Sequence, residues 1–165
     1  MLGWLAILPN PQVQSSARVT THVIRLEVPS LFEYRDLAMR MVASACRLVV
    51  DGRKNELVGK LKRDGQFTAQ VMSAFGEAFN NVVLHSYDAD GGHLQIEIEL
   101  ATDALTIRIM DFGKTFDIHS VPTPNLDDLP ESGLGLFIIR SCMDVVSYVP
   151  GSPNVMSMTK YIGKQ

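Results

Sequence analysis

Glu77 and Asn81 stand four residues apart in the segment 68–85, whose apolar spacing predicts a helix. This spacing places both side chains on one helix face, one turn apart. An amide oxygen is a hard ligand suited to Mg²⁺, and a neighbouring carboxylate can accept a proton from a water or hydroxyl nucleophile. A solvated polar stripe on an amphipathic helix would show the same spacing, so both interpretations stand for the pair alone.

Asp111 directly follows 105–110, a segment whose alternating hydrophobicity predicts a strand. A carboxylate at a strand end, at the mouth of a pocket, could accept a hydrogen bond from an exocyclic amine such as that of adenine. Gly113 would let the backbone approach the ring. An ordinary turn aspartate is the alternative interpretation of Asp111.

A glycine turn, Gly133-Leu134-Gly135, comes just before an expected helix over 136–146. Glycines allow unusual backbone angles, and a helix start offers unpaired N–H groups to a phosphate. The turn is neither a Walker loop, since no Gly-Lys-Ser/Thr follows, nor a dinucleotide fingerprint, since it does not directly follow a strand. Alone it could be a plain connection from loop to helix. Together, the three blocks supply the parts of a nucleotide site.

The composition indicates a single globular domain that does not contact nucleic acid or a membrane. The 165 residues are 46% hydrophobic and 20% charged, as in ordinary globular domains. The net charge is −3, so the chain lacks the excess of positive charge that favours binding of nucleic acid. No apolar run approaches the roughly 20 residues that span a bilayer. We expect residues 1–16 to be an N-terminal tail and residues 17–165 one domain. Cys46 and Cys142 fall in apolar helical patterns, which predicts free thiols in a reducing compartment such as the cytoplasm.

The elements needed to position these residues follow the order β-α-α-β-β-α-β-β, which predicts a two-layer α/β sandwich with a mixed sheet covered on one face by helices. The expected strands are 21–28, 93–100, 105–110, 145–149 and 155–162, and the expected helices are 31–50, 68–85 and 136–146. Ser30 and Glu33 suggest a capping box for the first helix. Its expected core face is Leu37, Met41, Ala45 and Leu48; that of the second helix includes Val71, Phe75, Ala78 and Val82.

In order and spacing, the three blocks resemble those of the GHKL superfamily (gyrase, heat-shock chaperone, histidine kinase, MutL). Within it, the chain looks like the anti-sigma-factor serine kinases of bacteria. The resemblance rests on Glu77-Ala78-Phe79-Asn80-Asn81, on the segment from Asp111 to Asp117, and on the segment from Gly133 to Ile139. It covers about residues 20–163.

This resemblance implies a Bergerat-type ATP-binding fold and a role for each matching residue. Asn81 would bind Mg²⁺ and ATP, Glu77 would be the general base, and Asp111 would take the adenine amine. Gly113 would shape the adenine site, and residues 117–132 would form a lid over ATP. The remaining ATP-binding residues would be Ser132, Gly133, Leu134, Gly135 and Leu136.

The resemblance also implies a function and partners. The chain would be a cytoplasmic Mg-ATP-dependent protein-serine kinase and anti-sigma factor, and it could form a homodimer. It would phosphorylate a STAS-type anti-anti-sigma protein and so control a sigma factor by partner switching. The lid from Ile118 to Ser132 contains no Lys or Arg, and Lys114 is the nearest cation in sequence. This departure favours an alternative, a non-catalytic ATP-gated binding switch; a non-nucleotide interaction domain would require all three blocks to be coincidental.

Overall fold

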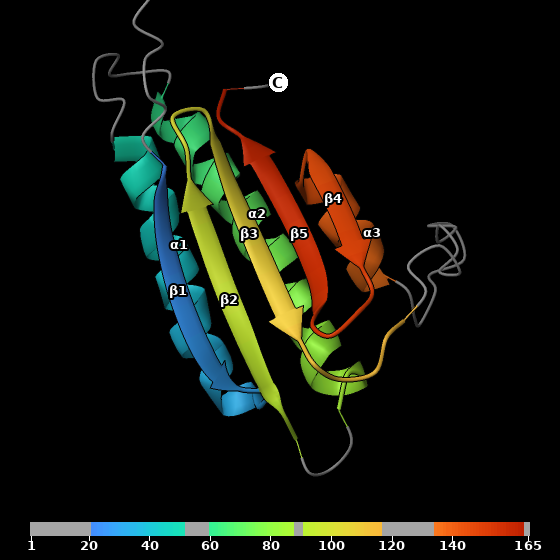
Figure 1. Cartoon of the computed structure of the whole chain (residues 1–165). Coiled ribbons are helices and arrows are strands. Elements are labelled where there is room, and N and C mark those ends of the chain that lie inside the picture. Colours follow the sequence, from blue (N-terminus) through green and yellow to red (C-terminus); the bar gives the residue numbers. More distant parts are fainter. Residues whose placement is uncertain (1–20, 52–59, 88–90, 117–133, 164–165) are drawn as a thin grey trace, which may run out of the picture.

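In the computed structural model, helices cover one face of a five-stranded sheet (Figure 1). The structure describes residues 21–51, 60–87, 91–116 and 134–163. Its elements are β1 (His22–Pro29), a 3-10 turn (Phe32–Tyr34), α1 (Arg35–Asp51), α2 (Lys60–His85), β2 (His93–Leu100), β3 (Ala104–Asp111), α3 (Leu134–Cys142), β4 (Val145–Val149) and β5 (Asn154–Tyr161). The predicted two-layer α/β sandwich is therefore confirmed. Residues 1–16, and with them the predicted tail, lie outside the described residues, so the division of the chain stays a prediction.

The sheet is antiparallel between all its neighbouring strands, so the expectation of a mixed sheet was wrong. The strand order is β1-β2-β3-β5-β4. β2–β3 and β4–β5 are hairpins, and β5 pairs antiparallel with β3. β3 and β4 run in the same direction, but β5 lies between them and prevents a parallel pair. As a result, the end of β3 lies beside the start of β5, where Asp111 is opposite Asn154.

The apolar residues of the strands and of the helices form one hydrophobic core between the sheet and the helices. Alternate residues of β2 and β3 are buried, as their hydrophobic alternation predicts. The expected core face of α2 is also confirmed, because Val71, Phe75, Ala78 and Val82 are all buried. Phe75 and Phe79 add a tilted ring contact with centroids 6.1 Å apart. This packing fixes which side of α2 remains available for Glu77 and Asn81.

The face of α1 toward the core differs from the predicted one. Leu37 and Leu48 are 53% and 60% exposed, and of the expected stripe only Ala45 is fully buried. The buried positions lie about one residue further along and are small or medium-sized: Ala38, Val42, Ala45, Cys46 and Val49. The side chains that face the core are thus smaller than those of the predicted stripe, so packing in the core rather than hydrophobicity alone selects the inward face.

The predicted capping box at the start of the first helix is also wrong. The Ser30 amide donates to the Gly92 carbonyl at 2.7 Å, which holds Ser30 beside the sheet. Its Oγ is buried and makes no hydrogen bond among the described residues. Leu31, rather than Ser30, is the N-cap residue of the 3-10 turn. It is extended, and no side-chain hydrogen bond caps the turn, which then leads into α1 at Arg35. The sheet contact therefore prevails over the local capping preference of Ser30.

The bounds of two other helices differ from those expected. α2 begins at Lys60 rather than at residue 68 and runs through Gly65, an exposed position with open space around it. α3 begins at Leu134, two residues before the expected start, and ends at Cys142. Leu134 and Gly135 therefore lie in the first turn of a helix rather than in the loop before it.

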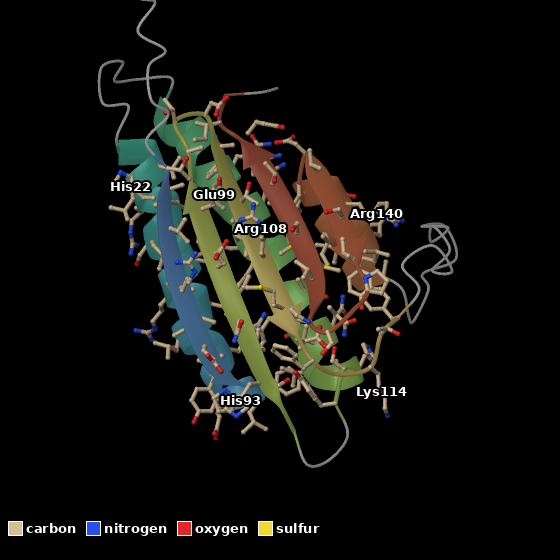
Figure 2. The ribbon with its side chains drawn as sticks, in the orientation of Figure 1. His22, His93, Glu99, Arg108, Lys114 and Arg140 are labelled. Carbon is tan, nitrogen blue, oxygen red and sulfur yellow. The ribbon has the colours of Figure 1, made fainter. Side chains whose placement is uncertain are left out.

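The sheet face away from the helices carries charged side chains. Arg108 lies 3.0 Å from Glu97 and 2.8 Å from Glu99, and Arg25 also reaches Glu97 at 2.8 Å. Figure 2 shows Glu99 and Arg108 together on this face. Cys46 and Cys142 are free thiols as predicted, and burial raises the pKa of Cys46 to about 12. Over the described part of the chain, no helix is long and apolar enough to cross a membrane.

The exposed and buried faces of α1 predict opposite outcomes for two truncations. Val42→Ala should lower the free energy of unfolding by about 2 kcal/mol, because it removes buried methyl groups from a closed site. Leu48→Ala should change it by about 0.5 kcal/mol or less. Urea unfolding of the two variants measures both values. A larger loss for Leu48→Ala than for Val42→Ala would contradict the observed helix face.

Candidate functional site

The structure brings the first and third blocks together. A Cβ placed on Gly135 would lie 3.0 Å from Glu77 Oε2 and 3.4 Å from Asn81 Oδ1. The first turn of α3 therefore lies directly against the face of α2 that presents both polar side chains. Glu77 and Asn81 are only partly buried, so ligands can still reach them. Because position 135 is a glycine, no Cβ crowds the Glu77 carboxylate or the Asn81 amide there.

The first turn of α3 supplies N–H groups beside these side chains. The leading N–H groups of a helix have no intrahelical partner and carry the positive end of its dipole. Leu134 is exposed at this end, whereas Leu136 is buried and anchors the helix. Such a helix start can accept a phosphate next to Glu77 and Asn81. Ser132 and Gly133, also predicted to bind ATP, lie outside the described residues.

Asp111 is the last residue of β3 and is only 4% exposed. Its Oδ1 accepts hydrogen bonds from the Gly113 amide at 3.0 Å and from Asn154 Nδ2 at 3.0 Å. Burying a carboxylate costs free energy unless donors meet it, and here two donors do so. Asp111 is therefore a fixed, buried hydrogen-bond acceptor. Such an acceptor is suited to receive a hydrogen bond from an amine.

The second block is joined to the end of α2 through Gly113. A Cβ on Gly113 would collide with the carbonyl oxygen of Ser86, so only glycine fits there. The same carbonyl accepts a hydrogen bond from the Lys114 amide at 2.6 Å. The Ser86 amide in turn donates to Val82, which continues the helical pattern of α2. Asp111 and Gly113 are thus held at one end of the helix that carries Glu77.

The length of α2 sets the separation between the two halves of the site. Glu77 and Ser86 are nine residues apart, or about 13.5 Å along a helix that rises 1.5 Å per residue. The Asp111 carboxylate lies at the Ser86 end, and the helix start of α3 lies at the Glu77 end. This separation suits a nucleoside triphosphate, whose base and terminal phosphate are at opposite ends of an elongated molecule.

Two tyrosines surround the Asp111 end of the site. The Tyr87 hydroxyl donates to the His93 carbonyl at 2.6 Å and accepts from the Phe112 amide at 2.8 Å. The Tyr148 hydroxyl accepts from the Phe116 amide at 3.4 Å, and the ring centroids of Tyr148 and Phe116 lie 4.4 Å apart. Burial is the main cause that raises the pKa of both phenols, and the negative charge of Asp111 adds to it. The segment after Asp111 is therefore anchored on both sides.

The residues present fit a magnesium nucleotide. Gly135 leaves room beside the Asn81 amide, a suitable Mg²⁺ ligand, and the neighbouring helix start suits phosphate. No group of three or more His, Cys, Asp or Glu side chains gathers among the described residues. An ion at this site would therefore depend mainly on phosphate and water ligands, as Mg²⁺ commonly does.

Sequence reasoning missed Asn154, which is fully buried and bonded to Asp111. It follows the Pro150-Gly151-Ser152-Pro153 turn, where asparagine is a common turn residue and carries no motif. Only the pairing of β3 with β5 places it opposite Asp111. Correct strand order was therefore the signal that would have found it.

This arrangement of sheet, helices and glycine-bearing segments is that of a known class of nucleotide-binding domain. The family model described as "Histidine kinase-like ATPase domain" matches residues 36–160, which include Glu77, Asn81, Asp111 and Gly135. The structure and the match together define a histidine kinase-like ATPase domain.

Curated relatives narrow this class. The chain is 32% identical over 147 residues to the serine-protein kinase RsbW of Halalkalibacterium halodurans, an alignment that covers 84% of this chain and 88% of the relative. It is 38% identical over 102 residues to RsbW of Staphylococcus aureus, which covers 56% of this chain and 64% of that relative. The chain belongs to the RsbW family of serine-protein kinases.

Solved structures share the fold. The structure of the RsbU and RsbW domains of Rv1364c from Mycobacterium tuberculosis aligns with a TM-score of 0.50 at 16% identity, covering 84% of this chain and 31% of that one. The histidine kinase domain of the blue-light activated histidine kinase EL346 from Erythrobacter litoralis aligns with a TM-score of 0.50 at 14% identity, covering 79% and 62%. At these identities the likeness supports the architecture alone.

The contact between Gly113 and Ser86 predicts a large difference between two glycine substitutions. Gly113→Ala should lower the free energy of unfolding by about 1–3 kcal/mol or more, because its Cβ meets backbone that cannot move freely. Gly65→Ala, in open space within α2, should raise it by about 0.5–1 kcal/mol. Denaturant unfolding of both variants measures the difference. Equal stabilities would show that Gly113 is not in close contact with Ser86.

Proposed function

We propose that this chain is a Mg-ATP-dependent protein-serine kinase that acts as an anti-sigma factor. The observation that carries the proposal is the contact of Gly135 with Glu77 and Asn81 in the C-terminal half of α2, while Asp111 is held beside the C-terminal end of the same helix. Membership of the RsbW family supports phosphoryl transfer to serine. The partly exposed position of Glu77 suits a site that must admit the side chain of another protein.

Each site residue has one task in the proposed mechanism. Asp111 accepts the exocyclic amine of adenine, and the first turn of α3, with Leu134, Gly135 and Leu136, surrounds the phosphates. Asn81 would hold Mg²⁺, which neutralises phosphate charge when bound. Glu77 orients the hydroxyl of the acceptor serine and accepts its proton. Ser132 and Gly133 complete the phosphate turn in this proposal.

The proposed partners follow from the family. The acceptor is a serine of a STAS-type anti-anti-sigma protein, and phosphorylation of that protein leaves the kinase bound to a sigma factor. The proposed setting is the cytoplasm, and a homodimer is the proposed assembly. A net charge of −3 fits regulation through proteins rather than through direct contact with nucleic acid.

Transfer of a labelled phosphate tests Glu77 as the base. The purified chain, incubated with γ-labelled Mg-ATP and a lysate of its source, should label one small protein on serine. Glu77→Gln should reduce transfer by about 10²–10⁴-fold, because the general base is lost, while ATP binding changes by less than about threefold. Ser73→Ala, an exposed change one turn before Glu77, serves as the matched control and should retain full transfer. Full transfer by Glu77→Gln would exclude Glu77 as the base.

Binding of ATP with and without Mg²⁺ tests Asn81 as the Mg²⁺ ligand. Asn81→Ala should weaken ATP binding in the presence of Mg²⁺ and leave the weaker metal-free binding nearly unchanged, because only the metal-dependent contact is removed. Calorimetric titration with and without Mg²⁺ separates the two cases. An equal loss of ATP affinity with and without Mg²⁺ would show that Asn81 contacts the nucleotide rather than the metal.

An ATP-gated binding switch without phosphoryl transfer is the second candidate function. It is favoured by the segment from Ile118 to Ser132, which contains no Lys or Arg to stabilise the charge of a transferring phosphate. Intact ATP binding with no labelled protein would establish this switch. Phosphoserine on a bound partner would exclude it.

A further inference from the structure

We infer that Asn154 is a positioning residue that orients the Asp111 carboxylate toward the exocyclic amine of the bound base. The inference rests on the proposed function, in which Asp111 recognises adenine. Asn154 is fully buried at the start of β5 and lies opposite Asp111 in the β3–β5 register. Its side-chain hydrogen bonds among the described residues go to Asp111, Gly113, Lys114 and Gly151, so we expect its effect on the nucleotide to pass through Asp111.

The hydrogen bonds of the Asn154 amide leave it one orientation. Its Nδ2 donates to Asp111 Oδ1 at 3.0 Å and to the Gly113 carbonyl at 3.1 Å, and its Oδ1 accepts from the Gly151 amide at 3.1 Å. A flipped amide would place oxygen against two acceptors and the NH₂ group against a donor. In a fully buried site this arrangement costs far more than the observed one.

These bonds divide the tasks of the two Asp111 oxygens. Oδ1 receives both the Asn154 amide and the Gly113 amide, so its acceptor capacity is used within the protein. A donor from the base would then be accepted at Oδ2. By holding Oδ1, Asn154 fixes the carboxylate plane and prevents rotation that would move Oδ2 away from the amine. It also ties Gly113 to β5, so the acceptor and the adjacent backbone move as one unit.

A comparison of two nucleotides tests this role. Binding of ATP and of purine riboside triphosphate, which lacks the exocyclic amine, is measured for the wild type and for Asn154→Ala. The variant should bind ATP about tenfold to a hundredfold more weakly, the range expected for a hydrogen bond to a charged group. Its affinity for the amine-free nucleotide should fall by less than about threefold, because that ligand offers Asp111 no donor.

Thr159→Val is the matched control. Thr159 lies on the same strand and makes a 2.9 Å hydrogen bond to Thr106 of β3, away from Asp111. It should leave the ratio of the two affinities unchanged. A purely structural role of Asn154 would weaken both nucleotides equally, and that outcome would overturn the inference. Retention of the wild-type ratio by Asn154→Ala would overturn it as well.

A second variant and a measurement on the wild type test the inference further. Asn154→Asp keeps the shape but exchanges the donor for an acceptor, and it should lose the preference for ATP as Asn154→Ala does. If both variants unfold, the side-chain amide resonance of Asn154 in the wild type should shift with ATP but not with the amine-free nucleotide; equal shifts would overturn the inference. Failure of the wild type to prefer ATP would instead refute the proposed role of Asp111, which separates the two hypotheses.

Discussion

The close approach of two glycine-bearing segments to α2 is the constraint on which the site depends. Gly113 lies against the Ser86 carbonyl at the end of this helix, and Gly135 lies against Glu77 and Asn81 nine and five residues before Ser86. A side chain at Gly113 would push Asp111 and its strand away, and one at Gly135 would crowd the side chains of Glu77 and Asn81. Because both contacts lie along one helix, its rise sets the distance between the two ends of the site.

The order of the strands provides the second requirement, a buried acceptor with fixed donors. β5 is inserted between β3 and β4, which places Asn154 beside Asp111 although 43 residues separate them in the chain. Hydrophobic alternation along β3 directs Ile107, Ile109 and Asp111 to the same buried face. The strand pattern that builds the core therefore also brings a carboxylate to the edge of that core, where a neighbouring strand must supply its hydrogen bonds.

Much of this arrangement could be predicted from the sequence, and the errors share one physical cause. The hairpin strands and the core face of α2 follow from local periodicity, and both were predicted correctly. The inward face of α1, the role of Ser30 and the pairing of β3 with β5 depend on contacts between distant segments. Leu37 and Leu48 form a stronger apolar stripe than Ala38 and Val42, yet the smaller side chains face inward, a choice that depends on packing against other segments. Asn154 was missed for the same reason.

The two ends of the site differ in rigidity, and this difference suits a kinase that acts on another protein. Asp111 and Asn154 are buried and held by hydrogen bonds on several sides, so this end of the site is rigid, as the proposed recognition of a base requires. Glu77, Asn81 and Gly135 are partly exposed, and Leu134 is exposed beside them. A serine hydroxyl carried by a folded partner can reach a proton acceptor only where the surface is open. In the proposed function, recognition of the base is therefore separated from access of the acceptor, and α2 links the two because it carries Glu77 and is followed by Ser86, which contacts Gly113.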